Sequence, residues 1–166
     1  MKRTVTLILM TALAWTLGGC GYSMQPLHRT DVRTVAVSIF ASKELRRELE
    51  FELTRQLVKF IELRTPYKVV HDPKRADTEL RGEVLYLHAP VLTEDTDTDN
   101  PSDIEVILTC WFEWKDLRTG EVLRREDNIS GSATYAMAVN ETLDSATFEA
   151  SSRLAERIVE AMEKEW

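Results

Sequence analysis

The segment that most constrains the fold is Ile104–Lys115, in which apolar side chains occupy every second position. One face of this segment would carry Ile104, Val106, Leu108, Cys110, Phe112 and Trp114, and the other Glu105, Ile107, Thr109, Trp111, Glu113 and Lys115. A period of two is typical of a strand with one buried face. Asp116–Gly120 favours a turn and Glu121–Arg125 a returning strand, so we expect a hairpin over Trp111–Arg125.

Shorter alternating or compact apolar segments predict three more strands, at Val32–Phe40, Tyr67–His71 and about Thr78–His88. Gly82 lies inside the last of these, where glycine marks a bulge or the close approach of another backbone. The polar run Thr93–Asp103 predicts a loop. Residues 129–139 contain Gly131 and many small side chains, and the pattern leaves their structure open.

Two segments show the apolar spacing of amphipathic helices. The first runs from Lys43 to about Leu63, with Ser42 as its expected cap, and Thr65-Pro66 would end it. The second runs from Glu141 to about Glu165, with Asn140 as its expected cap.

The order strand, helix, strands, helix predicts an α+β fold in a single domain over residues 32–166. We expect a two-layer sandwich, in which a mostly antiparallel sheet of four or five strands carries two helices on one face.

The N-terminus has the order of a secretory signal, because Lys2 and Arg3 precede the 13-residue apolar run Val5–Leu17. This run is shorter than the roughly 20 residues that a membrane-spanning helix needs. It ends in Leu17-Gly18-Gly19-Cys20, which resembles the lipobox of bacterial lipoproteins. The alternative is an ordinary signal peptide with an accidental cysteine.

The lipobox resemblance implies that residues 1–19 are removed, that Cys20 is acylated, and that residues 20–31 form a lipidated tether. Gly21, rather than aspartate, follows the cysteine, which by the sorting rule of enteric bacteria favours the outer membrane. Several acyl chains would hold the protein durably on a membrane. Cys110 would then have no disulfide partner within the chain.

The chain is acidic, with 28 acidic and 21 basic residues and a formal net charge of −7. Loss of residues 1–19 removes Lys2 and Arg3, which leaves 147 residues, 19 bases against 28 acids, and a net charge of −9. Because nucleic-acid binding requires a basic surface, this balance argues against a nucleic-acid partner.

No catalytic motif is present in the sequence, which therefore predicts no enzyme, no cofactor and no metal centre. The three histidines, His28, His71 and His88, lack metal-site spacing. The inward-facing Cys110 is expected to act as a small apolar side chain.

The loop from Asp95 to Asp103 places acids at positions one, three, five and nine of an EF-hand pattern. Asn100 stands where that pattern requires glycine, and Val106 where it requires the bidentate glutamate. We interpret the acidic loop as solvated, with calcium binding as the alternative.

Trp111 and Ile107 lie on the expected outer face of the best-predicted strand. Either Trp111 only partly covers that face, or the face docks on a partner, since contiguous apolar surface marks interaction sites.

Six segments together resemble the lipopolysaccharide-assembly lipoproteins of the LptE family over about residues 20–125. They are Cys20–Tyr22, Val32–Phe40, Arg47–Leu57, Arg64–Val70, Ala76–Gly82 and Trp114–Gly120. The last forty residues share only a closing helix with the family.

The resemblance implies a non-catalytic, lipid-anchored protein at the periplasmic side of the cell outer membrane. It would plug and assist a large LptD-like β-barrel that assembles lipopolysaccharide in the outer leaflet. The alternative is a lipid-anchored adaptor of another envelope transport complex. Any contact with lipopolysaccharide, a polyanion, would need a local basic cluster in this acidic chain.

The best candidate for that cluster in the sequence is Arg118, Arg124 and Arg125. The alternative is that these arginines pair with Glu121, Glu126 and Asp127 on a solvated hairpin.

Overall fold

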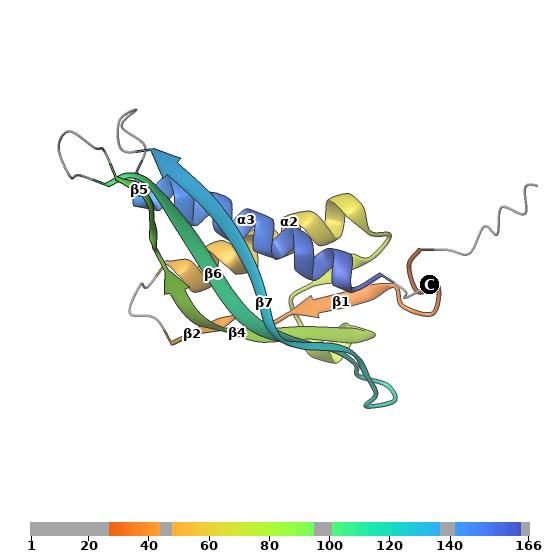
Figure 1. Ribbon diagram of the computed structural model, residues 1–166. Helices are drawn as coiled ribbons and strands as arrows, with labels where there is room; N and C mark the ends of the chain where they lie inside the picture. Colours follow the sequence, from red (N-terminus) through yellow and green to blue (C-terminus); the bar gives the residue numbers. More distant parts are fainter. Residues whose placement is uncertain (1–26, 44–47, 95–100, 137–141, 164–166) are drawn as a thin grey trace, which may run out of the picture.

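The computed structural model describes residues 27–43, 48–94, 101–136 and 142–163. Within them, one mixed sheet has its inner face covered by two α-helices (Figure 1). The strands are β1 (Thr34–Val37), β2 (Ala41–Ser42), β3 (Lys68–Val70), β4 (Thr78–His88), β5 (Val91–Glu94), β6 (Pro101–Asp116) and β7 (Val122–Ala136). The helices are α2 (Leu49–Arg64) and α3 (Leu143–Ala161), with a short 3₁₀ helix, η1 (Pro73–Arg75), between β3 and β4.

The predicted two-layer α+β arrangement, with two helices on one face, is confirmed, but the predicted sheet was too small and too uniform. The described sheet has seven strands, and β1 pairs in parallel with β3 and with β4, while β2 also runs parallel to β4. Helix α2 lies between β2 and β3 in the chain. A helical crossover of this kind allows the strands before and after it, β1 and β3, to run parallel. The strands β2 and β5 are too short to show an alternation in the sequence.

The predicted hairpin is confirmed as β6 and β7, which pair antiparallel along most of their length. Strand β6 also pairs antiparallel with β4 and β5. The loop predicted over Thr93–Asp103 was too wide, because β5 and β6 extend into both of its ends. Residues 129–139, for which the sequence predicted no structure, belong to β7 as far as Ala136. The last three of them lie outside the described residues.

The inner face of β6 is buried as predicted. Val106, Leu108, Cys110 and Phe112 have no exposed surface, and Trp114 is 2% exposed. Helix α3 packs on β6 and β7 through an apolar stripe that includes Ala150, Leu154 and Ile158, and α2 packs on α3 and on β1, β2 and β3 through one that includes Leu53, Leu57 and Ile61. Burial of this one continuous apolar face joins the two layers.

The predicted helix caps were wrong where the structure describes them. Ser42 pairs with Val84 as part of β2, and α2 begins only at Leu49. Helix α3 begins at Leu143, and its capping box is formed by Thr142 and Ser145, each side chain accepting from the other's backbone N–H. The predicted cap Asn140 lies outside the described residues.

Gly131 of β7 lies directly beneath helix α3. A Cβ atom at this position would come within 2.4 Å of the Leu154 nitrogen and 2.6 Å of the Ala150 oxygen. Gly82 of β4 is similarly enclosed by the Phe40 ring and the Trp111 carbonyl oxygen. The expected close approach at Gly82 is therefore confirmed, and Gly131 allows two backbones to touch.

Substitution of Gly131 by alanine should destabilise the fold, because the new methyl group meets helix backbone rather than a side chain that can rotate away. We expect a loss of about 1–3 kcal/mol in the free energy of unfolding, typical of overpacking. Urea denaturation followed by circular dichroism measures it. The matched control is Thr134→Ala, an exposed change on the same strand, and equal midpoints for the two variants would contradict the prediction.

Candidate functional site

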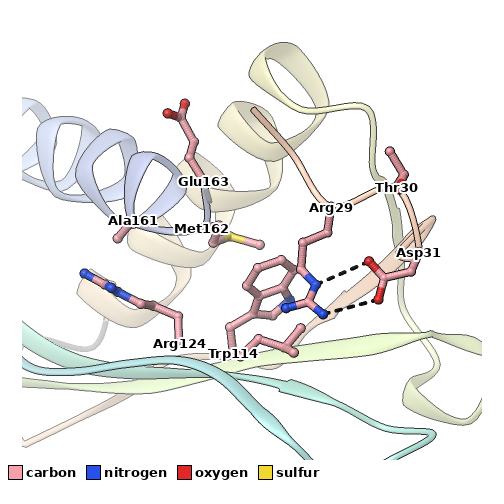
Figure 2. A pocket seen from close by; sticks show the side chains of 9 residues that line it. Arg29, Thr30, Asp31, Trp114, Arg124, Ala161, Met162 and Glu163 are labelled. Carbon is pink, nitrogen blue, oxygen red and sulfur yellow. Dashed lines mark hydrogen bonds and ion pairs between the residues drawn. The ribbon is translucent and has the colours of Figure 1, made fainter. Parts of the chain in front are cut away.

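A pocket of about 620 Å³ opens at the end of the sandwich where β1 begins and α3 ends (Figure 2). It is lined by Arg29, Thr30, Asp31, Trp114, Leu123, Arg124, Ala161, Met162 and Glu163. Three parts of the chain that are distant in sequence therefore meet there: the segment before β1, the β6–β7 hairpin and the last turn of α3.

Trp114 forms the buried wall of this pocket. Its ring lies 5.8 Å from that of Tyr67, centroid to centroid, and the Tyr67 hydroxyl accepts a hydrogen bond of 2.9 Å from the Arg29 backbone nitrogen. The indole Nε1 of Trp114 is buried and has no hydrogen-bond partner among the residues that the structure describes. A buried donor of this kind favours a ligand or water that can accept a hydrogen bond.

Both signs of charge line the pocket. Arg29 donates to Asp31 at 3.3 Å, which lowers the pKa of that carboxyl, and Arg124 pairs with Glu126 at 2.6 Å. Glu163 adds a further acid. The pocket is thus suited to binding a polar group beside the apolar Leu123 and Met162.

The turn of the β6–β7 hairpin is held by Asp116, whose side chain is 5% exposed. Arg118 pairs with this carboxylate at 2.9 Å, and the backbone nitrogens of Arg118 and Thr119 donate to it. The Arg118 hydrogen bond is the largest cause that lowers the pKa of Asp116 to about 2. The hairpin tip therefore has a fixed, ionised centre.

The three hairpin arginines of the sequence prediction do not form one cluster. Arg118 lies at the turn with Asp116 rather than with Glu121. Arg124 lies opposite Trp114 and lines the pocket, whereas Arg125 lies opposite Glu113 on the outer face of the sheet. Arg125 pairs with Asp127 at 2.9 Å, so the expected pairs with Glu126 and Asp127 are both present.

The outer sheet face is a network of charged and polar side chains around Trp111. The indole Nε1 of Trp111 donates to Glu83 at 3.0 Å, and the guanidinium of Arg125 lies 5.6 Å from the indole ring centroid. Glu113, whose side chain is 8% exposed, binds Arg81 at 2.7 Å and Arg125 at 3.4 Å.

Trp111 and Ile107 are both only partly exposed on this outer face. The face thus offers fixed hydrogen-bonding groups with an aromatic side chain at their centre. The sequence indicated the aromatic residue, but nothing in it indicated that Glu113 would bridge two arginines.

Cys110 lies in the core as predicted. Its burial, with a smaller contribution from the charge of Glu126, raises the thiol pKa to about 12, so the thiol stays protonated. Cys20 and most of the acidic loop, at 95–100, lie outside the described residues. Across the parts that are described, no three His, Cys, Asp or Glu side chains gather as metal ligands, and no helix is long and apolar enough to cross a membrane.

Arg29, Asp31 and Met162 were absent from the predicted site. The only signal in the sequence is the Arg-x-Asp spacing of the first two. In the sequence, Met162 belongs only to the apolar stripe of α3, because no neighbouring residue indicates which part of the hairpin it contacts.

The chain matches the model of the lipopolysaccharide-assembly family LptE over residues 32–162. No curated protein sequence matches the chain.

Several solved structures share the fold. A PelC variant from Paraburkholderia phytofirmans, a dodecamer, has a TM-score of 0.57 at 15% identity, covering 86% of this chain and 96% of that one. An uncharacterized lipoprotein B from Nitrosomonas europaea has a TM-score of 0.55 at 10% identity, covering 85% and 89%. The rare lipoprotein B of Shewanella oneidensis has a TM-score of 0.52 at 19% identity, covering 78% and 93%. At these identities the likeness concerns the fold.

The pairing of Asp116 predicts a pH dependence of stability. Since its pKa is lower in the folded than in the unfolded chain, its contribution is complete above about pH 4 and is lost as the pH falls toward about 2. Asp116→Asn should lower the thermal midpoint near neutral pH and make its decline through this acid range shallower than in the wild type. Glu121→Gln, at an exposed acid of the same turn, is the control. Parallel curves for Asp116→Asn and the wild type would refute this assignment.

Proposed function

This chain belongs to the lipopolysaccharide-assembly family LptE, and we propose that it is an outer-membrane lipoprotein that plugs and assists a large LptD-like β-barrel. The barrel would assemble lipopolysaccharide in the outer leaflet. Residues 1–19 are the signal peptide in this proposal, and Cys20 carries the lipid that holds residues 20–31 and the domain 32–166 on the periplasmic side.

The observation that carries the proposal is the extent of the family match. It spans residues 32–162, from the strand before α2 to the end of α3, and so includes both layers of the sandwich. A match over the whole architecture supports a shared role more strongly than a match to one motif.

The outer face of the sheet supports a location inside a barrel. The lumen of a large outer-membrane barrel is polar. Arg81, Glu83, Glu113 and Arg125 present charges that are already paired, so this face needs few counter-charges from a barrel wall. Trp111 offers an aromatic contact at the centre, and aromatic residues dominate binding energy at many interfaces.

We propose a structural and recognitional role rather than a catalytic one. The buried, protonated Cys110 supports this, because it gives no accessible thiolate nucleophile. The chemistry of the described site is hydrogen bonding and ion pairing.

Co-purification from detergent-solubilised envelopes tests the barrel partnership. The full chain should recover a large β-barrel protein in equal amounts. Trp111→Ala should reduce that recovery at least tenfold, as expected for an aromatic residue at the centre of an interface. The matched control is Phe148→Ala, which truncates an exposed aromatic side chain of α3 in the helical layer and should leave recovery unchanged.

One outcome would contradict the barrel proposal, and another would contradict only the placement of Trp111 at the interface. Recovery of an inner-membrane or periplasmic transport complex without a barrel would favour the adaptor alternative. Equal recovery by Trp111→Ala and Phe148→Ala would leave the partnership intact but remove Trp111 and the neighbouring Ile107 from the interface.

Although they form no single cluster, Arg118, Arg124 and Arg125 all lie on the β6–β7 hairpin and are our candidate contacts for separate phosphates of lipopolysaccharide, through exchange of their present acidic partners. Replacement of all three by glutamine should weaken binding of purified lipopolysaccharide at least tenfold, because hydrogen bonds to charged groups are strong. The control is Lys43→Gln with Arg55→Gln, at exposed paired bases outside the hairpin. Unchanged binding in a fluorescence titration would show that these arginines are not the contacts.

A further inference from the structure

Four exposed basic side chains surround the start of β1: Arg33, Lys68, Lys74 and Arg75. We call them the β1-entry patch. The Lys68 backbone nitrogen donates to the Arg33 carbonyl oxygen at 2.9 Å, and η1, which carries Lys74 and Arg75, lies beside β1. None of the four forms an ion pair within the described part of the chain, in contrast to the hairpin arginines.

The acids near the β1-entry patch are held by other groups. Asp77 accepts hydrogen bonds from the backbone nitrogens of Arg33 and Thr34 and from the Thr34 hydroxyl. Asp72 accepts from the Lys74 backbone nitrogen, and Asp31 pairs with Arg29.

The local charge therefore differs in sign from the charge of the whole chain. With Arg29 included, five bases face the three acids Asp31, Asp72 and Asp77, a balance of +2 in a chain of net charge −7, or −9 after loss of residues 1–19. Arg64 and Arg118 border this region, and each already has acidic partners, Glu156 and Glu160 for the first and Asp116 for the second. The β1-entry patch is the part of this surface that remains available to an anion.

The patch lies where the chain enters the fold. Leu27, the first described residue, lines a hollow of about 360 Å³ together with Arg33 and Pro66. Leu27 is the seventh residue after Cys20, and an extended chain of that length spans at most about 25 Å. A lipid on Cys20 therefore keeps Leu27, which lines the same hollow as Arg33 of the patch, within about 25 Å of the bilayer surface. Leu27 and Leu63 are 38% and 70% exposed at the same end.

We propose that the β1-entry patch docks the domain on the anionic phospholipid headgroups of the bilayer that holds its lipid anchor. The proposal rests on the acylation of Cys20, which belongs to the proposed function. Each Lys or Arg near an anionic leaflet strengthens attachment about fivefold. Docking fixes which end of the sandwich faces the bilayer. The acidic remainder of the chain then points away from the negatively charged bilayer surface, which would repel it.

The test uses the full chain as isolated from cell envelopes, in two kinds of vesicle, one of phosphatidylcholine alone and one in which a third of the lipid is phosphatidylglycerol. The readout is the rate at which a water-soluble amine reagent labels each lysine, measured by peptide mass spectrometry. Labelling of Lys68 and Lys74 should slow at least fivefold on the anionic vesicles only, and the protection should disappear in about 1 M salt, where the Debye length is about 3 Å. Lys59, exposed on α2, is the internal reference and should react equally on both.

The double variant Arg33→Gln, Arg75→Gln retains both reporter lysines and should lose most of their protection. Its matched control, Lys43→Gln with Arg55→Gln, removes two exposed bases elsewhere and should keep it. All four side chains are exposed or mostly exposed, so these changes leave the core untouched.

The outcomes separate docking from anchoring. Attachment to both vesicles with equal labelling would overturn docking and leave the anchor intact. Attachment and lysine protection on anionic vesicles alone would support docking but contradict the anchor, and attachment to neither would overturn both. A third vesicle, of phosphatidylcholine with purified lipopolysaccharide, tests the other anion. Protection on this vesicle but not on phosphatidylglycerol would overturn docking on phospholipid and assign the patch to lipopolysaccharide.

Discussion

The contact between the backbone of α3 and Gly131 of β7 determines how the two layers meet. Because no side chain separates them at this point, the helix lies close enough for Arg153 and Arg157 to reach backbone carbonyls of β7, at Ser132 and Ser130. These bonds occupy acceptors on a strand that, in the described sheet, pairs only with β6, and such edges otherwise invite pairing with other chains. The same placement brings the end of α3 over Trp114 and completes the pocket (Figure 2).

The acidic and basic side chains are distributed so that some regions of the surface carry paired charges and one carries a net positive charge. On the outer sheet face, Glu113 is shared by Arg81 and Arg125, and the hairpin tip is neutralised by Asp116 with Arg118. The β1-entry patch keeps its positive charge because bases outnumber the acids around it and its four bases form no ion pair within the described residues. An acidic protein can thus present a basic end, which its net charge alone would not suggest.

The elements with a long, regular pattern were predicted well, and those without one were not. The alternation of β6 and the apolar stripes of α2 and α3 gave the correct inner faces, since burial of one face repeats at the period of the backbone. The short strands β2 and β5 escaped prediction, as did the parallel pairing of β1 with β3 and β4. Pairing direction depends on partners that are distant in sequence.

The same division, between features set by local pattern and features set by partners distant in sequence, applies to the candidate site. The sequence by itself determined that Cys110 and Trp114 face the core, that Trp111 faces outward, and that a hairpin turns at Asp116–Gly120, because each depends on local alternation and turn chemistry. Only the tertiary structure decided that Arg124 lines the pocket while Arg125 shares Glu113 with Arg81, and that Arg33, Lys68, Lys74 and Arg75 share one surface. The physical reason is that a charge acts through space, so its partner is set by which strands and helices the fold brings side by side.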